Sequence, residues 1–442
     1  MEKELDNMNK IVLIGAGSAN FGLGTIGDIF KSKILQGSTI MLHDINTKAL
    51  EKTKNIANKY KDKLGVNYNI EATTEREKAL KDANYCIISI EIGNRFDLWD
   101  QDWKIPLQYG FKQIYGENGG PGGLFHSLRI APVILDICED IIKICPNAFV
   151  FNYSNPMQRV CHAVTTKYPE LKFVGLCHEI ESMERQLPTI METDFSNIEI
   201  KAGGLNHLSI LLQAKYKDSQ KDGYPIIHEK FESYYSKVTS EYYPSRPGGE
   251  RGVFFELYKL YGYLPITTDS HLGEYIQWAY SIADHEAIME FYNNYKKRCL
   301  SFYDDESNYS EYFQMNDKTN ERIVPIMEAI IEDANFEESA VNVPNNNFID
   351  CLPDNIVVEV PGILNKSGVT GLKLENYPSE FGSLLNNQVS TIKLTTEAVI
   401  NKSKDSAYLA LLADPIVDNV KFAAKLLDNM LSFQKKYLGY LK

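Results

Sequence analysis

Residues 10–20, Lys-Ile-Val-Leu-Ile-Gly-Ala-Gly-Ser-Ala-Asn, decide the fold of this 442-residue chain. The run Ile11 to Ile14 is apolar throughout, which predicts a buried strand, and residues 19–31 have the apolar spacing of a helix. The same rhythm continues to about residue 187, with further strands expected over 39–44, 85–92, 148–153 and 173–176, and helices over 46–61 and 124–142. We therefore expect an α/β fold with a doubly wound parallel sheet of the Rossmann type.

The turn between the first strand and helix carries Gly15, Gly17 and Ser18. Because glycine has no Cβ atom, the backbone here can approach a pyrophosphate closely, and the N–H groups at the start of the helix can bind it. Asn20 stands where the usual dinucleotide fingerprint has its third glycine. A plain glycine turn is therefore the alternative to a dinucleotide site.

An acidic residue, Asp44, ends the second expected strand. Rossmann-type folds place here an acid that accepts hydrogen bonds from the ribose hydroxyls of adenosine, which favours NAD over NADP. Asp44 could instead cap the following helix, although Asn46 is a good cap as well. We predict that Gly15, Gly17, Ser18 and Asp44 bind NAD.

The second half of the chain lacks this regular rhythm and predicts a mixed α+β domain. We expect a loop over residues 335–347, an extended segment over 356–364 and closing helices from about residue 394. At 442 residues the chain exceeds what one hydrophobic core usually serves. We therefore expect two domains, residues 1–197 for the dinucleotide and residues 198–442 for substrate, metal and oligomerisation.

The composition excludes several classes of function. The net charge of −13 argues against a nucleic-acid partner, because affinity for nucleic acid comes mainly from basic side chains. We expect no membrane insertion and no export, since no apolar stretch of about 18 residues and no signal-peptide pattern occurs. Seven scattered cysteines suit a reducing compartment. We expect a cytoplasmic protein that forms a homodimer or homotetramer.

Polar motifs stand at the ends of further apolar strands, where open α/β sheets bind their ligands. Asn155 belongs to one of them, Cys177 to the next, and His207 follows shortly after. A thiolate and an imidazole supply part of a divalent-metal site, whose other positions substrate oxygens and water can fill. Taken by themselves, a cysteine and a histidine thirty residues apart are more often unrelated core residues.

Read together, these motifs resemble family 4 of the glycoside hydrolases, the NAD- and metal-dependent glycosidases. The resemblance rests on their order and spacing along nearly the whole chain, and its parts are residues 15–18, 44, 120–123, 155–157, 177–178, 205–207 and 357–361. It implies an O-glycosyl hydrolase that uses NAD and Mn²⁺, or another divalent metal, on a small-molecule glycoside. The family is an exception to the rule that glycosidases use two carboxylates.

The resemblance also implies the order of the chemistry. NAD takes a hydride from C3 of the sugar, and the metal polarises the resulting ketone. A base then removes the acidified C2 proton, and the leaving group departs from C1. Water adds to the unsaturated intermediate, and the hydride returns to C3.

The matching motifs imply roles for four residues. Cys177 and His207 bind the metal, and Asn155 contacts substrate hydroxyls. His178, beside the metal cysteine, is a candidate catalytic residue that could hydrogen-bond a reacting hydroxyl. A purely structural imidazole is the alternative reading of His178.

The general base is assigned by the same resemblance to Asp269. Its structural alternative is a helix N-cap before residues 272–280. His271 and Tyr275 are further candidates for the base, since members of the family use tyrosine in this role.

The sugar is expected to be unphosphorylated. Family members that act on 6-phosphosugars resemble one another in having Asp or Asn after the metal cysteine and a phosphate-binding arginine before an Ile-Pro segment. This chain has His178 and an acidic run over residues 97–102 instead, although Arg95 keeps a 6-phospho-α-glycosidase as an alternative.

The motifs resemble two branches of the family that act on different sugars. Residues 174–178 resemble α-galactosidases, and Glu179 resembles α-galacturonidases, so we expect an α-hexoside of the galactoside or galacturonide type. A uronate would need a cation such as Arg129 or Arg246, and Arg129 is also expected on a solvated helix face. Outside the family, the rival is an NAD-dependent 2-hydroxyacid dehydrogenase, whose first domain would look similar.

Overall fold

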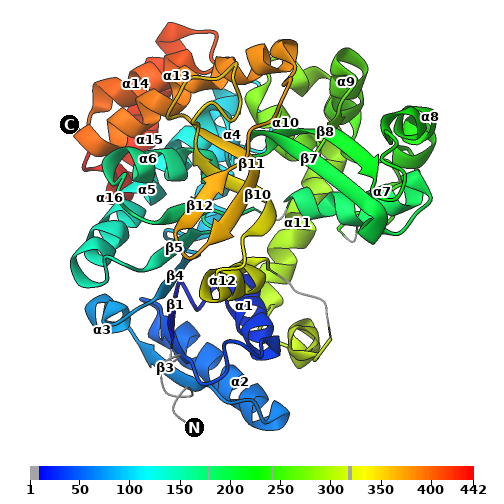
Figure 1. Ribbon diagram of the computed structural model, residues 1–442. Coiled ribbons are helices and arrows are strands. Elements are labelled where there is room, and N and C mark those ends of the chain that lie inside the picture. Colours follow the sequence, from blue (N-terminus) through cyan, green and yellow to red (C-terminus); the bar gives the residue numbers. More distant parts are fainter. Residues whose placement is uncertain (1–8, 178, 241, 317–320) are drawn as a thin grey trace.

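One mixed sheet of twelve strands runs through the molecule (Figure 1). The structure is a computed structural model, and it describes residues 9–177, 179–240, 242–316 and 321–442. The strands follow one another in the order β3-β2-β1-β4-β5-β6-β10-β11-β7-β8-β9, and β12 pairs with β11.

The first six strands form the parallel half of the sheet. They are β1 (Lys10–Ile14), β2 (Thr39–His43), β3 (Asn69–Thr73), β4 (Tyr85–Ile88), β5 (Phe149–Asn152) and β6 (Phe173–Gly175). Their order, 3-2-1-4-5-6, is that of the Rossmann fold. The predicted parallel sheet is confirmed, and only β3 was not expected from the sequence.

Alternate residues of β1 face two separate cores, as the two-residue period of a strand requires. Ile11 and Leu13 belong to a core that includes apolar residues of α1 (Ala19–Lys31) and α2 (Thr47–Leu64). Val12 belongs to the other core, with residues of α5 (Gly120–Ile144) and of the C-terminal helices. The sheet is therefore covered on both faces.

The remaining strands extend the sheet in antiparallel fashion beyond β6. They are β7 (Ile198–Leu205), β8 (Leu208–Tyr216), β9 (Leu264–Pro265), β10 (Phe336–Pro344), β11 (Val357–Asn365) and β12 (Gly368–Gly371). The hairpin of β7 and β8 lies in green at the right of Figure 1. Hydrogen bonds between neighbouring strands continue without a break from β3 to β9. One sheet therefore includes strands from both sides of the expected domain boundary at residue 197.

The expectation of a loop over residues 335–347 was wrong, because most of that stretch forms β10. Its polar side chains suggested solvent exposure, but three of them, Glu338, Asn342 and Asn345, are buried. Asn342 lies opposite Gly175 of β6 and donates to the buried carboxylate of Glu359 on β11. Asn345 bonds the backbone of the turn that follows. Tertiary pairing overrode the local composition.

Helices surround this sheet. Those not yet named are α3 (Arg76–Leu80), α4 (Arg95–Gln108), α6 (Met157–Lys167), α7 (Ser182–Met191), α8 (Tyr224–Tyr235), α9 (Gly252–Tyr261), α10 (Asp269–Leu272), α11 (His285–Ser301), α12 (Ile323–Glu332), α13 (Ser379–Asn401), α14 (Lys404–Ala413), α15 (Val420–Phe433) and α16 (Lys435–Leu438). Short 3-10 turns lie at 179–181, 195–197, 273–275, 279–281, 306–308 and 310–313.

The C-terminal helices return to the first half of the chain. Helix α13 starts at Ser379, well before the expected start near residue 394, and contacts α5 and α6. These helices are orange and red at the top left of Figure 1. The division into domains at residues 197 and 198 stays a prediction. Over the described residues, no helix combines the length and apolar character needed to cross a bilayer.

Candidate active site

The turn after β1 is shaped by contacts that only glycine allows. Gly15 has φ of +90°, and a Cβ atom there would lie 2.0 Å from the carbonyl oxygen of Ser89. A Cβ on Gly17 would lie 2.8 Å from an oxygen of Asp44, and the Gly17 N–H donates to that oxygen at 2.8 Å. The predicted glycines and Asp44 therefore meet at one point at the end of β1 and β2.

Asp44 is not the cap of the helix that follows it. Asn46 is the N-cap of α2 and accepts from the N–H of Ala49, while Asp44 accepts from the N–H groups of Gly17 and Asn46. Ser18 is the N-cap of α1 without a side-chain cap, and its buried Oγ has no hydrogen-bond partner among the described residues. A dinucleotide pyrophosphate fits this turn, because it would supply the acceptor that Ser18 lacks.

The missing third glycine of the fingerprint has a substitute two residues further on. A Cβ on Gly22, within α1, would lie 2.4 Å from the carbonyl oxygen of Ala16. Gly22 thus permits the close approach of helix and turn that the third glycine serves in the usual motif. The sequence pattern offered no signal for this shift.

Cys177 and His207 come together as predicted from the sequence. Cys177 follows β6, and His207 lies in the turn between β7 and β8 with φ of +64°. The Sγ of Cys177 lies 3.4 Å from Nε2 of His207. Burial raises the pKa of the Cys177 thiol well above its usual range, and the nearby Glu359 and Glu179 add to this rise. A sulfur and an imidazole nitrogen at this separation suit a divalent cation that replaces the thiol proton.

Two further possible ligands lie beside this pair. One ring nitrogen of His207, one of His271 and a carboxylate oxygen of Glu179 all lie within 4.8 Å of one another. The rings of His207 and His271 are stacked, with centroids 4.2 Å apart and an interplanar angle of 19°. The sequence had marked His271 only as a possible base and Glu179 only as a sign of the sugar.

Buried carboxylates support the loop of His207 and the ring of His271. Glu359 accepts from Asn206 at 2.7 Å and from Ser209 at 3.2 Å, which fixes both sides of the turn that carries His207. Glu274 is fully buried, and its Oε2 lies 3.6 Å from Nδ1 of His271. Such partners hold the orientation of imidazole ligands in metal sites.

Asp269 occupies a different environment from the one expected of a base. Its buried carboxylate accepts four main-chain N–H groups, those of Gly252, Val253, Phe254 and Asp284. The four donors occupy all the lone-pair positions of the carboxylate, so none is left to take a proton from a sugar. Asp269 does cap a helix, but the helix is α9 and not the one that follows Asp269 in sequence.

Tyr275, a further candidate for the base, is buried near the metal pair. Burial raises the pKa of Tyr275 well above its usual range, Glu274 adds to the rise, and the Arg159 guanidinium acts in the opposite direction. The charge of Cys177 also acts on this phenol. Asn155 lies just beyond β5, half-buried, at the same edge of the sheet as Cys177. His178 lies outside the described residues.

A small polar cavity lies beside the site, lined by Glu91, Arg95, Trp99, Asp102, Glu117, His126 and Arg129. Arg95 pairs with Glu117 at 2.8 Å. Arg129 is buried and donates to both oxygens of Asp102, so the expected solvated position of Arg129 was wrong. Burial opposes the charged form of His126, but Glu91 outweighs it and raises the pKa of His126. Both arginines already have carboxylate partners.

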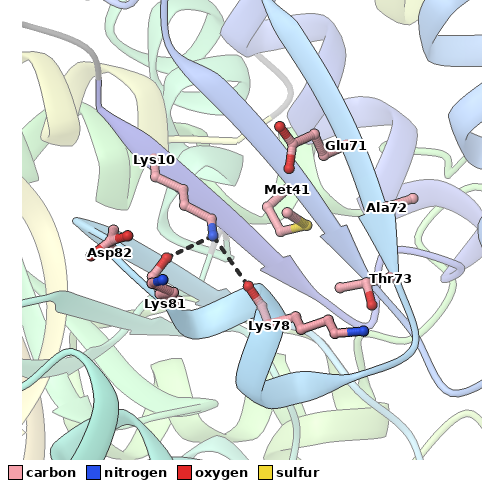
Figure 2. A pocket seen from close by; sticks show the side chains of 8 residues that line it. All are labelled: Lys10, Met41, Glu71, Ala72, Thr73, Lys78, Lys81 and Asp82. Carbon is pink, nitrogen blue, oxygen red and sulfur yellow. Dashed lines mark hydrogen bonds between the residues drawn. The ribbon is translucent and has the colours of Figure 1, made fainter.

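Hydrogen bonds link Glu117, which lines this cavity, to Glu274, which faces His271 beside His207. The N–H groups of Glu117 and Asn118 donate to Oε1 of Glu274, whose other oxygen faces His271. Another hollow lies apart from this site (Figure 2). It lies between β2, β3 and α3, where Lys10 donates to the carbonyls of Lys78 and Lys81. None of its lining residues belongs to a predicted motif.

Models of known protein families match both halves of the chain. A family 4 glycosyl hydrolase model matches residues 10–193, and the model of that family's C-terminal domain matches residues 202–417. The chain belongs to family 4 of the glycosyl hydrolases. This membership confirms the resemblance inferred from the motifs and sets the dehydrogenase alternative aside.

Individual relatives of this family 4 glycosyl hydrolase differ in their sugars. An alpha-glucosidase of Erwinia rhapontici is 46% identical over 98% of this chain and 99% of its own. An alpha-galactosidase of Bacillus subtilis is 29% identical over 92% of this chain and 93% of its own. A solved 6-phospho-alpha-glucosidase from gut microorganisms, in complex with NAD and Mn²⁺, has a TM-score of 0.78 at 20% identity over 97% of this chain and 98% of its own. At that identity the likeness establishes the shared fold.

Proposed function

We propose that this glycosyl hydrolase cleaves neutral, unphosphorylated α-hexosides with NAD and Mn²⁺ as cofactors. The observation that carries the proposal is the distance of 3.4 Å between Cys177 Sγ and His207 Nε2. The glycine turn after the first strand, where a dinucleotide pyrophosphate fits, supports it. Two solved neighbours that share the fold hold both NAD and manganese, which supports the same pair of cofactors here. A homodimer or homotetramer and a cytoplasmic location stay predictions.

The chain's own residues divide the work as follows. When bound, NAD supplies the acceptor and donor of a hydride at C3 of the sugar, and the divalent cation supplies the Lewis acid for the oxygen at C3. Cys177 and His207 would hold the cation, and the turn of Gly15, Gly17 and Ser18 would hold the dinucleotide. Asp44 would accept from the adenosine ribose.

Asn155 and the base complete the proposed site. Asn155 would orient the sugar from the end of β5, at the sheet edge that carries Cys177. We assign the removal of the C2 proton to Tyr275, which would act as a phenolate and become the phenol, because the four main-chain donors on Asp269 occupy its lone pairs. The buried Arg159 guanidinium near Tyr275 would stabilise the phenolate that accepts this proton. His178 stays a candidate for a hydrogen bond to a reacting hydroxyl.

The charges around the cavity favour a neutral sugar. A phosphate or a uronate needs a cation that is free to pair with it. Arg95 is paired with Glu117, and Arg129 with Asp102. Arg246, the other cation considered for a uronate, pairs with Glu286 and Glu290 on α11. The alpha-glucosidase relative supports α-glucosides as the first substrates to test, with α-galactosides second.

A panel of nitrophenyl glycosides tests this proposal. Purified enzyme with NAD, Mn²⁺ and a thiol reductant is offered the α-glucoside, the α-galactoside, the α-galacturonide and the α-glucoside 6-phosphate. We expect the highest kcat/KM on one of the two neutral α-hexosides, with no net formation of NADH. A higher kcat/KM on the uronide or the 6-phosphate would contradict the assignment of a neutral sugar.

A further inference from the structure

The metal pair of Cys177 and His207 has two neighbours that sequence motifs do not assign to the metal. Oε1 of Glu179 lies 3.9 Å from Nε2 of His271, and both groups lie within 4.8 Å of a ring nitrogen of His207. Cys177 and Glu179 flank one residue after β6, and His271 comes from α10. Three donor groups, those of Glu179, His207 and His271, therefore lie close to one another, and the Cys177 sulfur adjoins them through its 3.4 Å approach to Nε2 of His207.

The ring of His271 is held in an orientation that suits a ligand. Its Nδ1 faces Oε2 of the buried Glu274 at 3.6 Å, and Nε2 is on the side of Glu179. Glu274 is itself fixed by the main-chain N–H of Asn118 at 2.9 Å. A carboxylate that holds one imidazole nitrogen while the other binds a metal is the common support of histidine ligands.

The charges of this cluster are also unbalanced. Glu179 and Glu274 make ion pairs only with His271 among the described residues, whereas nearby arginines are committed elsewhere. Arg95 pairs with Glu117 and Arg159 with Asp414. Two carboxylates around one imidazole, beside a cysteine, leave negative charge that a divalent cation would neutralise.

We propose that the divalent cation is bound by four protein groups, the Cys177 thiolate, the His207 and His271 imidazoles and the Glu179 carboxylate. This assignment rests on the metal requirement in the proposed function and adds two ligands to it. A six-coordinate ion such as Mn²⁺ would keep two positions for oxygens of the sugar. The assignment also removes His271 from the candidates for the base.

The test measures metal binding directly. The variants are His271→Asn and Glu179→Gln, with His228→Asn and Glu184→Gln as matched surface controls. Each protein with bound NAD is titrated with Mn²⁺, followed by electron paramagnetic resonance of the free ion, and with Co²⁺, followed by its visible absorption. Far-ultraviolet circular dichroism and the Kd for NAD show whether each variant is folded.

We expect the Kd for Mn²⁺ to rise by about tenfold or more in each of the two ligand variants and to stay unchanged in both controls. The Co²⁺ d–d bands should change in both ligand variants, while the charge-transfer band from thiolate to Co²⁺ stays, because Cys177 is intact. A folded His271→Asn or Glu179→Gln protein with wild-type Kd and wild-type d–d bands would overturn the four-ligand assignment.

The failure of the underlying function looks different from this. If the wild-type protein binds Co²⁺ without a thiolate charge-transfer band, or binds neither metal, the metal site of the proposed function itself is wrong. A second result would count only against the added ligands. In that case Cys177→Ser removes the charge-transfer band, but His271→Asn and Glu179→Gln bind Mn²⁺ like wild type.

Discussion

The dinucleotide turn and the metal site differ in how far apart their parts lie along the chain. Gly15, Gly17 and Asp44 lie within residues 15–44, just beyond the ends of two adjacent parallel strands, and the Gly17 N–H donates to the Asp44 carboxylate. Cys177, His207 and His271 come from a parallel strand end, an antiparallel hairpin and a short helix. The first region is a local motif, whereas the second exists only when the whole sheet has formed.

The largest effect should separate the two regions completely. Replacing Cys177 by serine removes the soft ligand, so the affinity for Mn²⁺ should fall by more than about 100-fold and turnover should be abolished. The Kd for NAD should stay within about twofold of wild type, because no contact of the glycine turn involves Cys177. Isothermal titration with each cofactor measures both values. A Cys177→Ser enzyme that turns over at the wild-type rate would contradict the assignment of Cys177 as a metal ligand.

Asp269 should behave as a structural anchor of the metal region. Asn at this position keeps the shape but turns an N–H₂ donor toward main-chain N–H groups, so the free energy of unfolding should fall by about 3 kcal/mol. Urea denaturation measures this change, and Asp284→Asn, which alters a neighbouring cap, is the matched control. A stable Asp269→Asn protein with wild-type affinity for Mn²⁺ but no turnover would instead restore Asp269 as the base.

His162 of α6 should make the free energy of unfolding depend on pH. Burial lowers the pKa of His162 to about 4, while the unfolded chain titrates near 6.5. The unfolded state therefore binds the proton first, and stability is lost as the pH falls from about 6.5 toward 4. Between pH 7.5 and pH 5 this one group should cost about 2 kcal/mol.

Glutamine at position 162 should remove that part of the pH dependence. Urea denaturation at the two pH values should give a smaller loss of stability in His162→Gln than in wild type. His228→Gln, at an exposed histidine, should retain the full loss. Equal losses in wild type and His162→Gln would mean that His162 is not held neutral by burial.

The smallest effect concerns the adenosine end of the dinucleotide region. Replacing Asp44 by alanine removes an acceptor for the ribose and for the Gly17 N–H, so the Kd for NAD should rise by about tenfold. The affinity for Mn²⁺ should not change. Asp62→Ala, at an exposed position of α2, is the control. An unchanged Kd for NAD would place the ribose elsewhere.

Sequence reasoning succeeded where a function depends on local order. The strand, turn and helix of residues 10–31 were readable because apolar period and glycine position act within a few residues. The pairing of Cys177 with His207 was also predicted, although only the joint pattern of motifs raised it above chance. In both cases the residues needed by the chemistry stand just beyond strand ends.

The parts that were missed depend on contacts between distant segments. β10 looked like a polar loop, because its buried polar residues find their partners on distant segments: Asn342 donates to Glu359 of β11, and Glu338 pairs with Arg322 at the start of α12. Asp269 matched a motif, but its four partners lie on α9 and at the start of α11, and no spacing rule connects them. Gly22 replaced the expected third glycine because the approach of α1 to its own turn depends on three-dimensional distance and not on position in a pattern.

The central claim is that the sugar is transiently oxidised so that its C2 proton can leave. The direct measurement is hydrolysis of a neutral α-hexoside in D₂O with NAD and Mn²⁺, followed by proton nuclear magnetic resonance of the released sugar. Because the C2 proton is taken by a base and replaced from solvent, we predict deuterium at C2 of the product. Complete hydrolysis with protium retained at C2 would contradict the account.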